Sequence, residues 1–97
     1  MIAKGIGNVW ASNLIDMQKF SQWNNGIKYL LMVFSKYGWI EPLKNKKGTT
    51  VANAFDNIFK SGRKPLLLWT DKGTEFYNTN VKQLLSRENI TLYSFDY

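Results

Sequence analysis

The segment LLLWTDKGTEFYN at 66–78 holds the carboxylate best suited to chemistry, Asp71. The apolar run before it predicts a buried strand, and α/β proteins carry reactive groups just past the carboxyl ends of such strands. An Asp two residues before a Gly can also accept a hydrogen bond from the turn backbone, so a purely structural role is the competing interpretation. Asp71 is therefore a candidate metal ligand or a turn-forming residue.

The composition restricts the chemistry that such a carboxylate can support. The 97 residues include no Cys and no His, which excludes a thiolate site, the usual zinc ligands and the commonest general base. A metal site must use oxygen ligands, which suits Mg²⁺ or Mn²⁺. The net charge of +6 favours a polyanionic partner, although a merely soluble basic domain fits it too.

A charged loop is predicted at 44–48, where Lys44, Lys46 and Lys47 could contact phosphate groups or could simply be solvated. No apolar run approaches the roughly 20 residues that cross a bilayer. The first ten residues make a poor signal peptide. No membrane association is therefore expected.

The elements that must position Asp71 begin with an antiparallel meander. Three strands are predicted before residue 44, at 9–16, 29–33 and 38–43. Asn25 and Gly26 predict a two-residue hairpin turn, because both tolerate positive φ. Pro42 indicates an edge or a bulge at the end of the third strand.

Helical periodicity begins after the meander. Apolar residues at helical spacing predict a first helix with Thr49 or Thr50 as its N-cap and Gly62 beyond its end; they are Val51, Ala54, Phe55, Ile58 and Phe59. A strand at 66–69 should be covered on both faces. A second helix, capped by Asn78 or Thr79, carries Val81, Leu84 and Leu85, and a fifth strand spans 90–95. The order β-β-β-α-β-α-β is typical of an α/β, ribonuclease H-like mixed sheet.

These segments, in this order, resemble the catalytic core of retroviral-type integrases in the DDE transposase and integrase superfamily. The most specific motifs are KYLLMV, FSKYGWIEPLK and WTDKGTEFYN. They are most similar to the integrases of Polinton (Maverick) transposons and their domesticated relatives. The resemblance covers nearly the whole chain and implies that residues 1–97 form one partial, C-terminally truncated integrase core domain.

The resemblance also implies a function, which is DNA integration by metal-dependent phosphoryl transfer on DNA ends. Three family carboxylates hold two Mg²⁺ or Mn²⁺ ions, and Asp71 matches the second of them. Lys72, Gly73 and Thr74 match the stretch beside the DNA backbone. The family implies a nuclear location, and we expect weak, non-specific DNA binding and allow for a homo-oligomer.

The chain departs from the family pattern at three points. The first family aspartate follows a Trp by three positions, where this chain has Asn13; Asp16 is the alternative ligand, but an odd offset along a strand turns it to the other face. A Val-Ile-Asp-like tripeptide is missing at Met32–Val33. The family glutamate lies about thirty-five residues beyond the second aspartate, past residue 97.

These departures predict that the chain is catalytically incomplete and does not hold the metals stably. The alternative function is a non-catalytic nucleic-acid-binding or protein-interaction module that retains the fold. We further expect Trp10, Trp39 and Trp69 in the core, and Trp23 covering an edge. Glu75 should orient the loop after Asp71.

Overall fold

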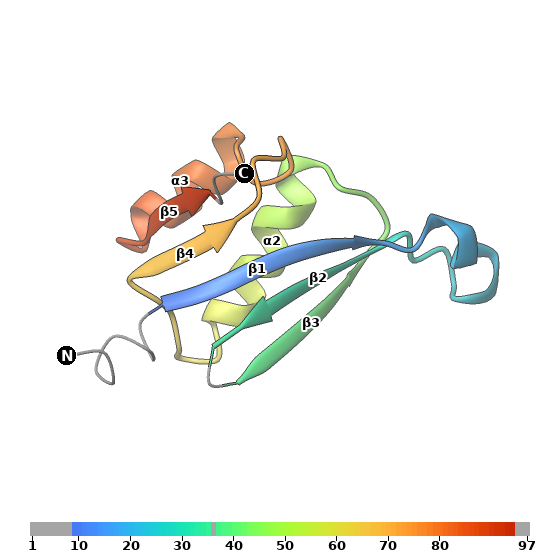
Figure 1. Cartoon of the computed structure of the whole chain (residues 1–97), viewed down its shortest axis with the longest axis horizontal. Coiled ribbons are helices and arrows are strands. Elements are labelled where there is room, and N and C mark those ends of the chain that lie inside the picture. The colour runs from blue at the N-terminus through green and yellow to red at the C-terminus, as the bar shows by residue number, and fades with distance from the viewer. Residues whose placement is uncertain (1–8, 36, 95–97) are drawn as a thin grey trace.

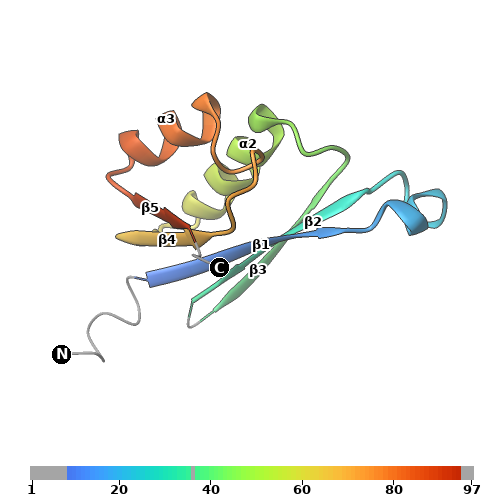
Figure 2. The same cartoon turned by 45° about the horizontal axis from the view of Figure 1, so that its top comes forward.

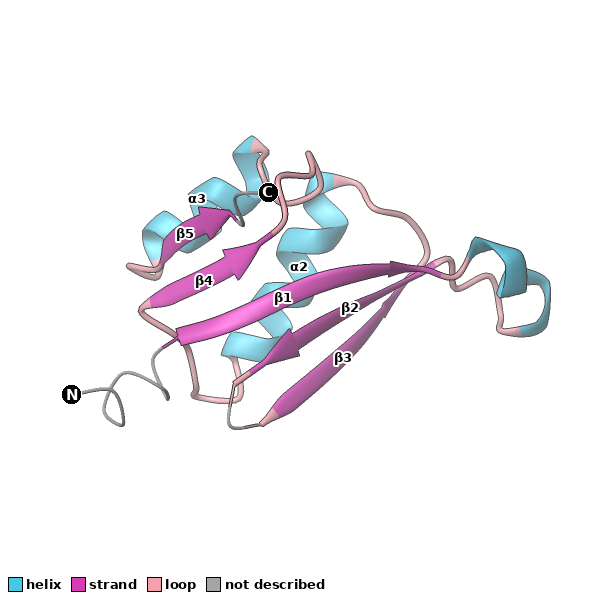
Figure 3. Cartoon of the chain, viewed as in Figure 1, coloured by secondary structure: helices cyan, strands magenta, loops and turns pink. Residues whose placement is uncertain are grey.

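The computed structural model describes residues 9–35 and 37–94. In these ranges one five-stranded sheet is accompanied by two α-helices and a short 3-10 helix (Figures 1 and 3). The elements in chain order are β1 (Val9–Asp16), η1 (Gln18–Trp23), β2 (Tyr29–Phe34), β3 (Gly38–Leu43), α2 (Gly48–Phe59), β4 (Leu67–Thr70), α3 (Thr79–Arg87) and β5 (Thr91–Ser94). Residue 95, the predicted end of the last strand, lies outside the described residues.

The first strand of the chain lies at the centre of the sheet. The strand order is β3-β2-β1-β4-β5. The meander pairs are antiparallel, whereas β1 pairs with β4, and β4 with β5, in parallel. This mixed sheet confirms the expected ribonuclease H-like fold. The β2–β3 hairpin pairs continuously with β1, so the missing tripeptide leaves no bulge in the strands.

Both α-helices cover the same face of the sheet, as Figure 2 shows. The residues predicted for their inner faces are all buried. Strand β1 presents Trp10 and Ser12 to this side, and both are 2% exposed. Trp39 stacks on Trp10 with a centroid separation of 4.6 Å. The core therefore lies between the helices and one sheet face, and Trp10 and Trp39 belong to it as predicted.

The opposite side of the sheet, called here the open face, has no helix over it among the described residues (Figure 2). Strand alternation assigns to it uncharged side chains from all five strands: Val9, Ala11, Asn13, Ile15, Leu30, Met32, Phe34, Ile40, Pro42, Leu67, Trp69, Thr91 and Tyr93. Trp69 stacks on Tyr93 here at 5.2 Å. The predictions of a core Trp69 and of a strand covered on both faces are therefore wrong.

The link between β1 and β2 also differs from the prediction. Asn25 and Gly26 do adopt positive φ, at 62° and 79°. They do not form a two-residue hairpin, because residues 17–28 separate the strands and contain η1. This segment, called here the arm, projects beyond the sheet (Figure 1).

The first helix begins without the predicted threonine cap. Its N-cap is Lys47, with no side-chain cap hydrogen bond. Thr50 instead donates its hydroxyl to Asn45 Oδ1 at 2.6 Å, which ties the helix to the loop before it. The helix ends near Gly62, whose φ of 93° favours glycine as predicted. No described helix combines the length and apolar character needed to cross a membrane.

Candidate functional site

Asp71 follows β4 at the carboxyl end of the parallel strands. Its Oδ1 accepts a hydrogen bond from the Gly73 amide at 2.8 Å, so Asp71 does form the turn that its sequence allows. The side chain is only half-buried. The turn and the candidate metal site are therefore compatible, because the same bond fixes the carboxylate at the strand end.

The loop after Asp71 is held by Asn78, the N-cap of α3. Asn78 Nδ2 donates to the carbonyls of Thr74 and Glu75 at 2.9 and 3.0 Å, and its Oδ1 accepts from the Val81 amide at 3.0 Å. A side chain at Gly48 would collide with Asn78, so this loop lies directly against the start of α2. The sequence predicted the cap as one of two residues, and gave no sign of the contact with Gly48.

The carboxylate of Glu75 lies against Gly73, where any Cβ would collide with it. Phe76 is fully buried and packs on Phe55 at 6.2 Å. Lys72 and Thr74 are exposed between these anchored positions. The loop is thus fixed from within while Lys72 and Thr74 face solvent.

The register of the central strands relates Asn13 to Asp71. The parallel pairing of β1 and β4 sets Ala11 opposite Trp69. Asn13 and Asp71 each follow this pair by two residues. Alternation along β1 directs Asn13 toward the open face, whereas Asp71 lies just past the end of β4. Ser12 bonds to the Trp69 carbonyl at 3.2 Å, which joins the two segments just before this level.

Asp16 lies three residues beyond Asn13, at the end of β1 and on the other side of the strand. Its two carboxylate oxygens accept hydrogen bonds from the Gln18 amide at 2.9 Å and from Gln18 Nε2 at 3.0 Å. The backbone hydrogen bond, with the side-chain bond second, lowers the pKa of Asp16. The Asp16 carboxylate is therefore bound to the start of the arm. It lies three residues beyond Asn13 and on the other face of β1.

Lysines gather at this end of the sheet. The Lys28 amide donates a hydrogen bond to the Leu43 carbonyl at the base of the arm, and Lys44 is the next residue after Leu43. Lys46 lies over the ring of Tyr29 at 5.6 Å. With Lys47, these four lysines are called here the basic end, and none of them forms an ion pair within the described ranges.

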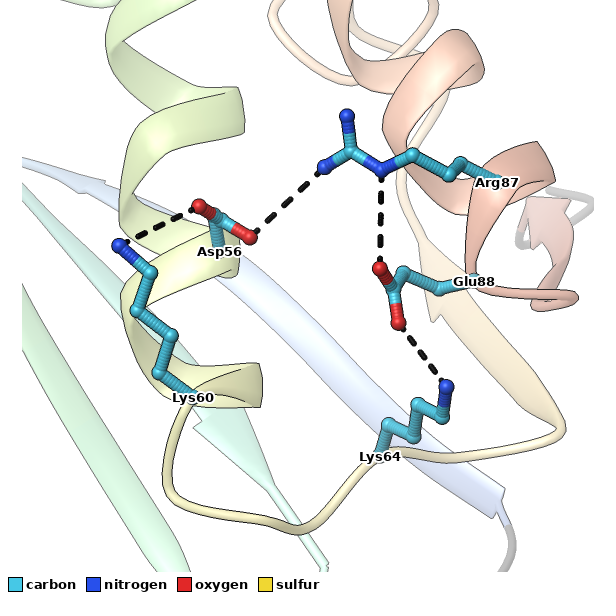
Figure 4. Close-up of polar contacts among 5 residues, drawn as sticks. All are labelled: Asp56, Lys60, Lys64, Arg87 and Glu88. Carbon is cyan, nitrogen blue, oxygen red and sulfur yellow. Dashed lines mark hydrogen bonds and ion pairs between the residues drawn. The ribbon is translucent and has the colours of Figure 1, made fainter.

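Lys60, Lys64 and Arg87, at the far end of the helices, form ion pairs instead (Figure 4). Asp56 contacts Lys60 at 3.6 Å and Arg87 at 3.8 Å. Glu88, at the end of α3, contacts Lys64 at 2.9 Å. Helix α2 separates these pairs from the basic end by about 18 Å, at 1.5 Å per residue. Within the described ranges the four lysines of the basic end thus have no salt bridge, whereas Lys60, Lys64 and Arg87 at the far end do.

Comparison with solved structures identifies the fold. The catalytic core domain of BIV integrase superposes with a TM-score of 0.74 over 92% of this chain and 55% of that one, at 14% identity. This chain has the fold of a retroviral integrase catalytic core. Its resemblance to integrase cores is thus confirmed at the level of fold, while the Polinton-type assignment stays a prediction.

Sequence comparison adds a relative from a mobile element. A transposon-derived protein of Caenorhabditis elegans is 37% identical in an 82-residue alignment that covers 80% of this chain and 29% of that protein. No protein-family model matches the chain. The integrase-like chain thus spans less than a third of that relative and about half of the BIV integrase chain.

The donor set of this integrase-like site does not fit two divalent ions. The strand residue that the β1–β4 register brings nearest to Asp71 on the open face is Asn13, a neutral amide. Within 9–35 and 37–94 no three acidic side chains converge. Glu88 lies at the far end with Lys64, and Asp96 lies outside the described residues. Two adjacent divalent ions repel strongly and need several carboxylates to offset their charge.

Proposed function

We propose that this chain is an integrase-core domain of mobile-element descent that binds the DNA backbone at its basic end. We propose further that it does not join DNA strands by itself. The observation that carries the proposal is the grouping of four lysines, none of which has a salt bridge to a described residue, at the end of the sheet toward which β1 and β4 run. Lysines in such an arrangement neutralise phosphates without reading sequence.

The electrostatics of the site support binding without chemistry. Mg²⁺ sheds its waters reluctantly and is usually held by carboxylates together with substrate phosphates. Asp71 with Asn13 offers a single formal negative charge. When bound in the integrase family, the metals would activate the attacking oxygen and stabilise the leaving one. Lys72, Gly73 and Thr74 line the loop that would lie beside the backbone, and action on chromosomal DNA would require a nuclear location.

A protein-interaction module is the second candidate, and the open face favours it. This apolar surface is free of charged residues and extends across five strands. Apolar patches of this extent mark interaction sites in other proteins. A homo-oligomer would be one form of such an interaction.

The DNA-binding proposal is tested by measuring duplex affinity against salt concentration. The variant Lys44→Gln, Lys46→Gln, Lys47→Gln removes three charges from the basic end. The matched control, Lys60→Gln, Arg63→Gln, Lys64→Gln, removes three from the far end. We expect the first variant to reduce the slope of log affinity against log salt by about 2.7, at 0.9 per lost phosphate contact.

The control should leave that slope nearly unchanged, with circular dichroism verifying that both variants fold. Equal losses in the two variants would mean that only the net charge matters, and the basic end would lose its assigned role. A wild-type chain that retains no duplex DNA at low salt would end the proposal.

A further inference from the structure

The arm is an ordered projection without a hydrophobic anchor. None of the residues of η1 is buried. Its backbone is closed on itself instead, by the Met17 amide on the Lys28 carbonyl at 2.6 Å and the Gly26 amide on the Ser21 carbonyl at 2.9 Å. The arm therefore keeps its shape without burying the aromatic side chains that it carries.

Those aromatic side chains are Phe20 and Trp23, which are 49% and 74% exposed. A Trp side chain is usually well buried in a folded domain, so this exposure is informative. Residues i and i+3 of a 3-10 helix are eclipsed, and Phe20 and Trp23 are three apart in η1. The two rings thus occupy the same side of the arm.

The charge of the arm matches an anionic partner. Residues 17–28 include Lys19 and Lys28 and no acidic residue. Strand β1 continues beyond the last residue of β4, and the arm projects past the end of β1, in the direction in which both parallel strands run (Figure 1). The base of the arm belongs to the basic end, because the Lys28 amide is hydrogen-bonded to the Leu43 carbonyl beside Lys44. The exposed rings and the unpaired lysines therefore share one end of the molecule.

We infer that the arm binds unpaired bases, with Phe20 and Trp23 as stacking surfaces and Lys19 and Lys28 holding the backbone. Exposed aromatic rings beside lysines are the means by which proteins hold single strands without regard to sequence. The inference rests on the proposed function, since it assigns to the arm the unpaired nucleotides of a DNA end whose duplex lies along the basic end.

The test compares two 20-nucleotide ligands by fluorescence anisotropy with the full chain, an oligothymidine and an abasic strand with the same phosphates. Wild type should bind the oligothymidine about fivefold or more tightly than the abasic strand, the effect of one stacked base. Phe20→Ala with Trp23→Ala should make the two affinities equal. The single variant Trp23→Phe should keep most of the difference between the two ligands, because it keeps a stacking ring.

The matched control is Leu66→Ala, which removes an apolar side chain from the residue before β4, with an exposed fraction (60%) between those of Phe20 and Trp23. It should leave both affinities as in wild type. Equal binding of the two ligands by wild type would overturn the inference, as would an unchanged preference in the double alanine variant. A blue shift of tryptophan emission with anionic lipid vesicles but not with oligothymidine, absent in Trp23→Phe, would also overturn it.

Duplex titrations separate this inference from the proposed function. Duplex binding that depends on Lys44, Lys46 and Lys47 but not on the rings, together with no preference for bases, would remove the arm's role and keep the basic end. If the chain binds no duplex but prefers the oligothymidine to the abasic strand, and this preference depends on Trp23, the role of the arm is supported and the proposed function is not.

Discussion

The side-chain amide of Asn78 contacts three parts of the molecule. These are the loop after Asp71, the start of α3 and Gly48. We predict that Asn78→Ala lowers the free energy of unfolding by about 2 kcal/mol, the upper range for loss of an N-cap. The reason is that the Val81 amide loses its acceptor and two loop carbonyls lose their donor. Urea denaturation measures the difference, and Asn80→Ala, at an exposed position of the same helix, should cost far less.

A second variant separates the two roles of Asn78. Asn78→Asp keeps the oxygen that accepts from Val81 and loses the Nδ2 donor, so its stability should lie between those of wild type and Asn78→Ala. Matching losses for Asn78→Ala and Asn80→Ala would contradict the role assigned to this amide.

The chemistry of the site depends on Asn13. We predict that Asn13→Asp alone leaves strand transfer at background in Mg²⁺ or Mn²⁺, because two carboxylates still do not supply the three of the family site. A strand-transfer and nicking assay on supercoiled DNA measures this. Metal-dependent product from the unaltered chain, lost in Asp71→Asn, would mean that the site is more complete than its described residues indicate.

At the scale of elements, Glu88 links the end of α3 to the segment before β4. Its hydrogen bond with Lys64 lowers the pKa of Glu88, with smaller effects from charge on Lys64 and Arg87. A carboxyl group whose pKa is lower in the folded state stabilises the fold above its unfolded pKa, and that contribution is lost as pH falls through the folded value.

We therefore predict that Glu88→Gln flattens the loss of stability below about pH 4.3, the ordinary glutamate pKa. The effect should be small and should shrink in high salt, because the pair is at the surface. Thermal unfolding followed from pH 6 to pH 3 measures it. Lys64→Gln should flatten the same range, and an unchanged pH profile in both variants would contradict the link.

Sequence periodicity predicted the regular elements well. Burial of one face imposes a fixed spacing of apolar residues on a helix, and a different fixed spacing on a strand. The strand at 9–16 and the buried residues of both helices are as predicted. The arm was not predictable in this way, because Asn25 and Gly26 fix only local φ and not the number of residues between strands. The position of Asn13 relative to Asp71 depends on the register between β1 and β4, which are far apart in the chain. The spacing of residues along one strand does not encode that register.

At the scale of the whole molecule, the open face leaves apolar side chains such as Phe34 and Ile40 46% and 58% exposed. We predict that the folded chain binds a hydrophobic dye and self-associates as its concentration rises. Ile40→Lys should weaken both effects while changing the free energy of unfolding by no more than about 0.5 kcal/mol, as for other surface substitutions. Dye fluorescence and sedimentation velocity measure these outcomes.

Leu31→Lys is the contrasting variant, because Leu31 is fully buried on the helix side of the neighbouring strand β2. It should prevent stable folding. Dye binding unaltered by Ile40→Lys would show that the dye binds elsewhere than the open face.

The central position of β1 has a consequence for synthesis on the ribosome. The strand that every other strand depends on leaves the ribosome first, and its parallel partner β4 follows only after β2, β3 and α2. Until then β1 has one unpaired edge, and pairing it requires contact across nearly sixty residues, from Ala11 to Trp69. Long-range parallel pairing is slow and leaves edges available to other chains. We therefore expect the nascent meander to be the stage at which this protein is most exposed to aggregation.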